Sequence, residues 1–161
     1  MMSDDVLQEL LDRQAISDVV NRYATGIDRR QWDLYRSCFT DPVTIDFSSF
    51  AGEGGAETIS VDDWVARVRG TLSGFDATHH QSSNHVHSIE GDDATCVSYM
   101  VAEHFLPNHL GDNFITLGGY YTNQLVRQEG EWKITNCKLT VTWNRGNRDL
   151  FRLAAERADK V

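Results

Sequence analysis

Several features that mark large classes of proteins are missing from this chain of 161 residues. Its apolar runs fall far short of the roughly 18 residues that a membrane-crossing helix needs. The acidic start, MMSDDVLQELLDRQ, has neither the basic nor the apolar region of a secretory signal. A formal net charge of −9 argues against binding the phosphates of nucleic acid. These absences predict a cytoplasmic protein with a small molecule or a protein as partner, and no nucleic-acid or membrane partner.

Cysteine and the familiar cofactor motifs are also scarce. Cys38, Cys96 and Cys137 are far apart and form no CxxC pair, which argues against a zinc knuckle or redox pair and favours a reducing compartment. The sequence contains no GxGxxG, Walker, GxSxG or HExxH motif. We therefore predict that the protein uses no cofactor.

What is present is the composition of a globular domain, with 40% hydrophobic and 24% charged residues. A chain of this length buries about two-thirds of its unfolded surface, so it needs neither disulfide nor metal to fold. We predict one domain over residues 1–161, with its core at about 5–145 and a short helix or tail at 147–161.

Hydrophobic spacing predicts the order of the elements. A helix over residues 4–28 has Ser3 as a plausible N-cap, and a second short helix runs from Trp32 to Phe39 until Pro42 stops it. A strand at 43–47 and a Gly- and Ser-rich loop precede a third helix at 61–72, which starts at Ser60. Four long strands follow, at 77–90, 94–107, 113–128 and 131–144. Two glycines at 118–119 are expected to mark a bend in the third of these strands.

This order predicts an α+β fold. Three helices from the N-terminal half would lie over the concave face of a curved, mixed or antiparallel sheet, forming a cone-shaped α+β barrel. The mouth of such a cone is a natural small-molecule pocket.

The segment THHQSSNHVHSIE carries four of the six histidines. Side chains alternate along a strand, so without a bulge His80 shares a face with Ser82 and Asn84. His79 would share the opposite face, a solvated or subunit-facing surface, with Gln81, Ser83, His85 and His87. The H-x-H spacing of His85 and His87 suits two metal ligands, but the sequence fixes no third ligand beside them, so we predict no metal site.

Three other residues could bring chemistry to the pocket. Asp28 ends the apolar stripe of the first helix, where burial would raise the pKa of its carboxyl group, although DRRQ from Asp28 is also a capping-box pattern for the next helix. Tyr23 lies on the same stripe and could donate a hydrogen bond or serve only as a core aromatic. His104 shares a strand face with small or soft residues, so it is either a pocket histidine or a structural one.

The chain resembles the NTF2-like superfamily, which has a cystatin-like fold, and specifically its SnoaL-like branch. The resemblance rests on NRYATGIDRRQWDLYRSCFTDPVTIDFSS, HHQSSNH, GDDAT and GGYYTNQLVRQEGEWKI. It is similar to the group that includes hexachlorocyclohexane dehydrochlorinase, scytalone dehydratase and bile-acid 7α-dehydratase. This resemblance implies a dyad of His80, which removes a proton, and Asp28, which orients and charges it. It also implies supporting roles for Tyr23 and His104. Further pocket candidates are Trp32, Asn84, Met100 and Tyr120.

The expected function is a cofactor-independent lyase of the dehydratase or dehydrohalogenase type, acting on a small, mostly apolar cyclic molecule. Two alternatives stay open: an isomerase or polyketide cyclase with the same base, and a ligand-binding or assembly domain without turnover. The outer sheet face, with Val97, Tyr99, Val101 and Phe105, predicts a homo-oligomer. The resemblance favours a trimer, and a dimer remains an alternative.

Overall fold

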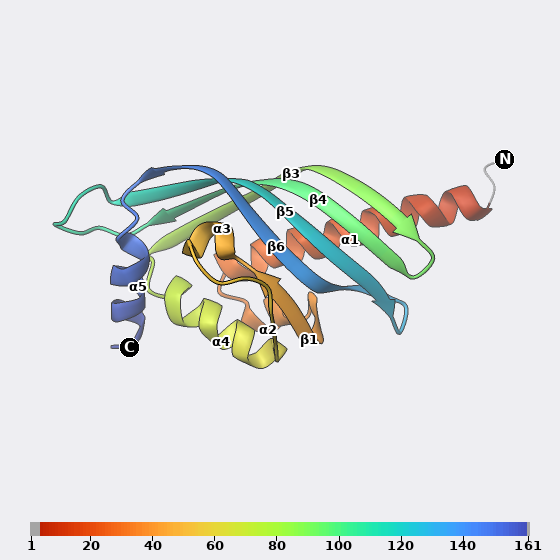
Figure 1. Ribbon diagram of the computed structural model, residues 1–161, viewed down its shortest axis with the longest axis horizontal. Helices are drawn as coiled ribbons and strands as arrows, with labels where there is room; N and C mark the ends of the chain where they lie inside the picture. The colour runs from red at the N-terminus through yellow and green to blue at the C-terminus, as the bar shows by residue number, and fades with distance from the viewer. Residues whose placement is uncertain (1–3, 161) are drawn as a thin grey trace.

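The computed structural model describes residues 4–160 and shows a curved sheet with helices packed against one face (Figure 1). Its six strands lie in the order β2-β1-β6-β5-β4-β3, and every neighbouring pair is antiparallel except β1 with β6. The elements are α1 (Asp4–Asp28), α2 (Trp32–Arg36), β1 (Phe39–Asp46), α3 (Ser48–Ala51), β2 (Glu57–Ile59), α4 (Val61–Leu72), β3 (Ala77–Glu90), β4 (Asp93–Phe105), β5 (Phe114–Gln128), β6 (Glu131–Gly146) and α5 (Leu150–Ala158). The α+β prediction is confirmed, and the sheet is open, with β2 and β3 at its edges.

Helix α1 lies along the inner face of the sheet, mainly against β3 (Figure 1). The stripe expected from the sequence is buried: Ile16, Val19, Val20, Tyr23 and Ile27. Burial of these side chains supplies most of the energy that holds the helix on the sheet. The expected N-cap, Ser3, lies outside the described residues. Helix α4 covers the same face further along, and its N-cap prediction is confirmed, because the Ser60 hydroxyl accepts a hydrogen bond from the Asp63 amide.

The segment between the first helix and residue 60 differs from the prediction. Helix α2 ends at Arg36, before Phe39, and Pro42 lies inside β1 instead of stopping the helix. The strand starts early because Phe39 pairs with Ile134 of β6 and buries its ring against Tyr23. The expected loop after β1 holds the one-turn helix α3 and the edge strand β2.

The predicted antiparallel meander is confirmed as β3 to β6, with ends that differ by at most two residues from the prediction. The glycine pair in β5 marks an irregularity in its pairing with β6. A Cβ atom at Gly118 would overlap the Trp143 ring, and one at Gly119 would overlap the Thr140 carbonyl oxygen. Both positions therefore exclude side chains because β6 approaches closely where the sheet bends.

The outer face of the sheet carries apolar side chains in contact with solvent. Tyr99 is 56% exposed and Phe105 is 45% exposed, whereas Val97 and Val101 are half-buried. Such a face is consistent with association between copies, and the homo-oligomer stays a prediction. Across residues 4–160, none of the helices has both the length and the apolar character required to cross a membrane.

Candidate active site

A pocket of about 600 Å³ lies between the inner face of the sheet and the segment from α3 to α4. Its wall combines residues of all six strands with helices α1, α3, α4 and α5. The apolar lining includes Ile27, Phe47, Phe50, Trp64, Met100, Leu117, Leu139 and Phe151. The polar lining includes His80, His104, Tyr23 and Tyr121 on the α1 and sheet side, and Ser48, Glu53, Glu57, Arg67 and Thr71 on the segment from α3 to α4. A mostly apolar cavity with a few convergent polar groups is typical of a small-molecule site.

The structure brings His80 and Asp28 together as the sequence suggested. His80 Nδ1 lies 2.7 Å from Asp28 Oδ1, although the two residues come from β3 and α1 and are 52 positions apart. The His80 side chain is only 8% exposed. Its other ring nitrogen, Nε2, has no hydrogen-bond partner among residues 4–160, and the residue lines the pocket. Because the carboxylate occupies Nδ1, Nε2 is the ring nitrogen left to face a ligand.

Asp28 is held by more than one donor. The His80 backbone amide donates to Oδ2 at 2.7 Å, and the Thr78 hydroxyl donates to Oδ1 at 2.9 Å. Arg30 in turn donates to the Thr78 hydroxyl and to the Ile27 carbonyl oxygen. Burial raises the pKa of Asp28, but the hydrogen bonds and charge of His80, with help from Thr78, outweigh it and lower the pKa overall.

Two expectations about Asp28 are therefore wrong. Its pKa is lowered, because donors surround a carboxylate that was expected to sit in an apolar wall. It also does not cap the next helix, since the N-cap of α2 is Gln31 and has no side-chain capping bond. The Asp28 carboxylate is occupied by donors of β3, which fixes it as an ionised partner of the histidine.

Tyr23 reaches the pocket from α1 and donates a hydrogen bond to the Tyr121 hydroxyl at 3.2 Å. Burial raises the pKa of both phenols, that of Tyr23 well above its usual value, so both remain neutral donors. The sequence prediction named Tyr120 instead, and it is wrong: Tyr120 does not line the pocket and pairs with Tyr99 and Thr140. Tyr121 shares its inward face with Leu117 and Leu125, and alternation from those leucines could have identified it.

His104 lines the pocket beside His80, with 5.4 Å between the two ring centroids. Phe75 and Phe151 pack against its ring at 5.0 and 4.8 Å. Burial, followed by the nearby His80, lowers the pKa of His104 to about 3. The imidazole is therefore neutral at physiological pH, and its buried Nδ1 has no hydrogen-bond partner within the described chain.

Two further pocket candidates, Asn84 and Trp32, are not in the lining. Asn84 has a positive φ of 53° and is exposed, at a bulge where the β3–β4 register shifts between Ser83 and Val86. Trp32 packs edge-on against Tyr35. Met100 does line the pocket, as predicted.

Because of the bulge, the prediction of which face of β3 each histidine lies on is wrong in part. Asn84 and His85 together occupy the span opposite one β4 residue, so alternation reverses after them. His85 and His87 therefore point inward, where both contact Ser17 of α1. Only His79 remains on the exposed face predicted for all three.

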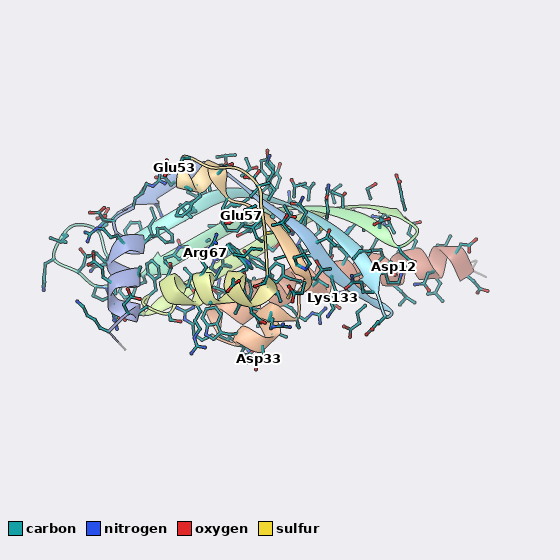
Figure 2. The ribbon with its side chains drawn as sticks, turned by 60° about the horizontal axis from the view of Figure 1, so that its bottom comes forward. Asp12, Asp33, Glu53, Glu57, Arg67 and Lys133 are labelled. Atoms are coloured by element: carbon teal, nitrogen blue, oxygen red, sulfur yellow. The ribbon has the colours of Figure 1, made fainter. Side chains whose placement is uncertain are left out.

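Residues missed by the sequence analysis shape the pocket ends. Phe151 of α5 lines the pocket and packs on His104, although this segment was expected to be a short helix or tail outside the core. At the opening, Arg67 of α4 pairs with Glu57 of β2, and Figure 2 shows both side chains in this region together with Glu53. These contacts join segments far apart in the chain, so no local sequence pattern predicts them.

The sequence and the fold of this chain are similar to those of known proteins. Residues 8–138 match the model of the SnoaL-like domain family. The crystal structure of the Kfla4162 protein from Kribbella flavida superposes with a TM-score of 0.84 at 35% identity, over 89% of this chain and 99% of that one. The hexachlorocyclohexane dehydrochlorinase LinA-type3 from Novosphingobium barchaimii gives a TM-score of 0.73 at 17% identity, over 88% and 94% of the two chains, a likeness of fold. The terrestric acid biosynthesis cluster protein E of Penicillium crustosum is 24% identical over 147 residues, which cover 88% of this chain and 90% of the relative.

Proposed function

This chain belongs to the SnoaL-like domain family, and we propose that it is a cofactor-independent lyase in which His80 and Asp28 eliminate water or a hydrogen halide from a small cyclic substrate. The observation that carries the proposal is the 2.7 Å contact between His80 Nδ1 and Asp28 Oδ1, with Nε2 left open to an apolar pocket. A histidine with a carboxylate partner and a free nitrogen is an arrangement suited to proton abstraction.

The chemical step follows from these contacts. His80 Nε2 takes a proton from a substrate carbon, and the electrons of that C–H bond form a C=C bond as the leaving group departs from the neighbouring carbon. Asp28 stabilises the imidazolium and keeps the proton of the resting ring on Nδ1. A leaving hydroxide takes the proton back from His80 and departs as water, whereas a halide departs as an anion and His80 later releases its proton to solvent.

Two neighbours of the dyad are suited to the leaving group. Tyr23 is a neutral phenol that shares a hydrogen bond with Tyr121, and both line the pocket. His104 is neutral, buried and has an unpartnered Nδ1. Neutral donors in a water-poor site stabilise developing negative charge without carrying a charge that needs solvation.

The substrate class follows from the lining. A pocket of about 600 Å³ is within the range of small-molecule sites. Its wall contains Phe47, Phe50, Trp64 and Phe151, which favour a flat or cyclic apolar compound. One fold relative is named a dehydrochlorinase, an enzyme of the eliminating type.

A second candidate is an isomerase that uses the same base. The paired hydroxyls of Tyr23 and Tyr121 favour it, because two neutral donors could hold the oxygen of an enolate while His80 moves a proton between carbons. Elimination and isomerisation differ in mass balance, so one measurement separates them.

The test is a screen of hydroxylated and halogenated cyclic compounds with the purified protein, followed by mass spectrometry. Loss of one water or one hydrogen halide supports the lyase, and an unchanged mass with altered absorbance supports the isomerase. Binding without any product would overturn both and leave a ligand-binding domain.

Variants tie the activity to the dyad. His80→Gln should lower turnover by about 10²- to 10⁴-fold, the usual contribution of a general base. His79→Gln is the matched control, because its side chain is exposed on the other face of β3, and it should retain turnover. Equal activity of His80→Gln and the control would refute the role of His80.

A further inference from the structure

A second polar cluster lies on the inner face of the sheet, outside the pocket lining. The bulge at Asn84 turns His85 and His87 toward α1, and His87 is the direct cross-strand partner of Cys96 on β4. One ligand atom from each of His85, His87 and Cys96 lies within 4.8 Å of the other two. The two histidines are half-buried, and Cys96 is fully buried. Bulges that re-aim side chains often accompany functional sites.

The cluster already has the partners that orient metal ligands. The Ser82 hydroxyl lies 2.8 Å from His85 Nε2, so Nδ1 is the His85 nitrogen that we assign to a metal. The Ser17 hydroxyl of α1 lies 2.9 Å from both His85 Nδ1 and His87 Nε2. Histidines that bind metals characteristically bond through their second nitrogen to a neighbouring group, and Ser82 can serve in that way.

Unpaired polar atoms beside Cys96 are an independent observation. Asn123 faces Cys96 from β5 as its cross-strand partner, and Ser98 follows two residues along β4. Both residues are at least 97% buried. Within residues 4–160, neither Asn123 Oδ1 nor Ser98 Oγ has a hydrogen-bond partner. Buried polar atoms nearly always have a hydrogen-bond partner, so these two atoms indicate an ion or an ordered water nearby.

We propose that His85 Nδ1, His87 Nε2 and Cys96 Sγ bind a transition-metal ion of the zinc class, beneath α1 and separate from the His80–Asp28 dyad. Two imidazoles and one thiolate suit a borderline-soft ion such as Zn²⁺, and exclude Mg²⁺ and Ca²⁺, which take oxygen ligands. Ser17 Oγ or a water supplies the fourth position. The sequence analysis rejected a metal site because no third ligand was fixed, and the pairing of β3 with β4 supplies it.

The geometry requires a modest contraction. Ligands about 2.0–2.3 Å from zinc lie roughly 3.3–3.8 Å from one another in a tetrahedral site. One ligand atom from each residue lies within 4.8 Å of the other two, so these atoms must approach one another by up to about 1.5 Å. Burial raises the pKa of the Cys96 thiol to about 11, so an ion has to displace its proton on binding.

The ion would tie three elements together. His85 and His87 belong to β3, Cys96 to β4, and Ser17 to α1, the helix that also carries Asp28. Binding would hold α1 on the sheet and stabilise the folded chain by mass action.

The test uses Co²⁺, whose thiolate complexes show a charge-transfer absorption, on the reduced, metal-stripped protein. The expected results are a charge-transfer band at one Co²⁺ per chain, its loss when Zn²⁺ displaces Co²⁺, and a higher melting temperature with Zn²⁺. Cys96→Ser should abolish the band, and His87→Gln should weaken Zn²⁺ binding at least tenfold in calorimetry.

Two controls make the same chemical changes elsewhere. Cys38→Ser alters another buried cysteine, whose thiol donates to the backbone carbonyl oxygens of Val19 and Leu34, and His79→Gln alters an exposed histidine. Both should keep the band and the affinity. Absence of the band in the unaltered protein, its survival in Cys96→Ser, or equal loss in His79→Gln and His87→Gln would overturn the proposal. If Cys96→Ser does not fold, as judged by circular dichroism, the comparison of His87→Gln with His79→Gln decides.

Discussion

Replacing Asp28 by asparagine tests the dyad at its most constrained point. The two carboxylate oxygens accept three hydrogen bonds: Oδ1 from the Thr78 hydroxyl and the His80 ring, and Oδ2 from the His80 backbone amide. Asparagine offers one acceptor oxygen and one NH₂ donor. If its oxygen faces the His80 ring, the NH₂ group opposes the backbone N–H. If the amide is flipped, the NH₂ group faces the ring, and His80 must move its proton to Nε2.

Either orientation has a calculable cost. A buried hydrogen bond to a charged group contributes about 1.5–3 kcal/mol, so Asp28→Asn should lower the free energy of unfolding by about that amount. If this loss falls on the His80 tautomer that carries its proton on Nδ1, the population of that tautomer decreases by roughly 10- to 100-fold, since 1.36 kcal/mol is a factor of ten. Loss of the charge that stabilises the imidazolium reduces the rate further, to about 10²- to 10⁴-fold in total.

Two assays follow these effects separately. Urea unfolding gives the change in stability, and ¹⁵N NMR of the histidine rings reports which nitrogen of His80 carries the proton. Asp33→Asn, at an exposed acid on α2 (Figure 2), is the control and should change neither. An Asp28→Asn protein that keeps the Nδ1 proton on His80 and retains stability would refute the reasoning from the contacts, whatever its substrate.

Three further predictions concern the fold that supports the site. The side chain of Arg127 holds the pKa of Asp12 at about 2, against an ordinary value of 3.8, so the pair stabilises the fold above about pH 4 and loses that effect as the pH falls toward 2. Asp12→Asn should therefore cost about 2 kcal/mol in urea unfolding at pH 7 and almost nothing near pH 2; an equal cost at both would contradict this account. Gly119→Ala should destabilise by about 1–3 kcal/mol, because its Cβ would lie 2.0 Å from the Thr140 carbonyl oxygen and the backbone must shift. Gly70→Ala, in the last turn of α4 with open space around it, should instead stabilise by about 0.5–1 kcal/mol, and thermal melts that shifted both variants in the same direction would refute the distinction.

Local patterns were sufficient for much of the fold. The apolar spacing in α1 and the alternation in the long strands gave the elements and the buried stripe, because each depends on residues near one another in the chain. The link between Asp28 and His80 came from a family resemblance that matched short motifs 52 positions apart. No local rule predicts that distance, since it depends on how α1 crosses β3.

The errors lie where contacts between elements far apart in the chain override the local pattern. Phe39 begins a strand because β6 offers it a partner, although its helical spacing extended α2. Phe151 joins the pocket because α5 folds back over His104, which no spacing within its segment indicates.

The sequence by itself determined the helical stripe, the meander and the placement of His80 on an inward strand face, because the periods of helix and strand are properties of the local backbone. Only the tertiary structure decided the orientation of His85 and His87. A single extra residue at the β3 bulge reverses every side chain after it, and this residue is set by the register with β4. That register also brings Cys96 beside the two histidines, and so turns two residues expected on a solvated or subunit-facing surface into part of a candidate metal site.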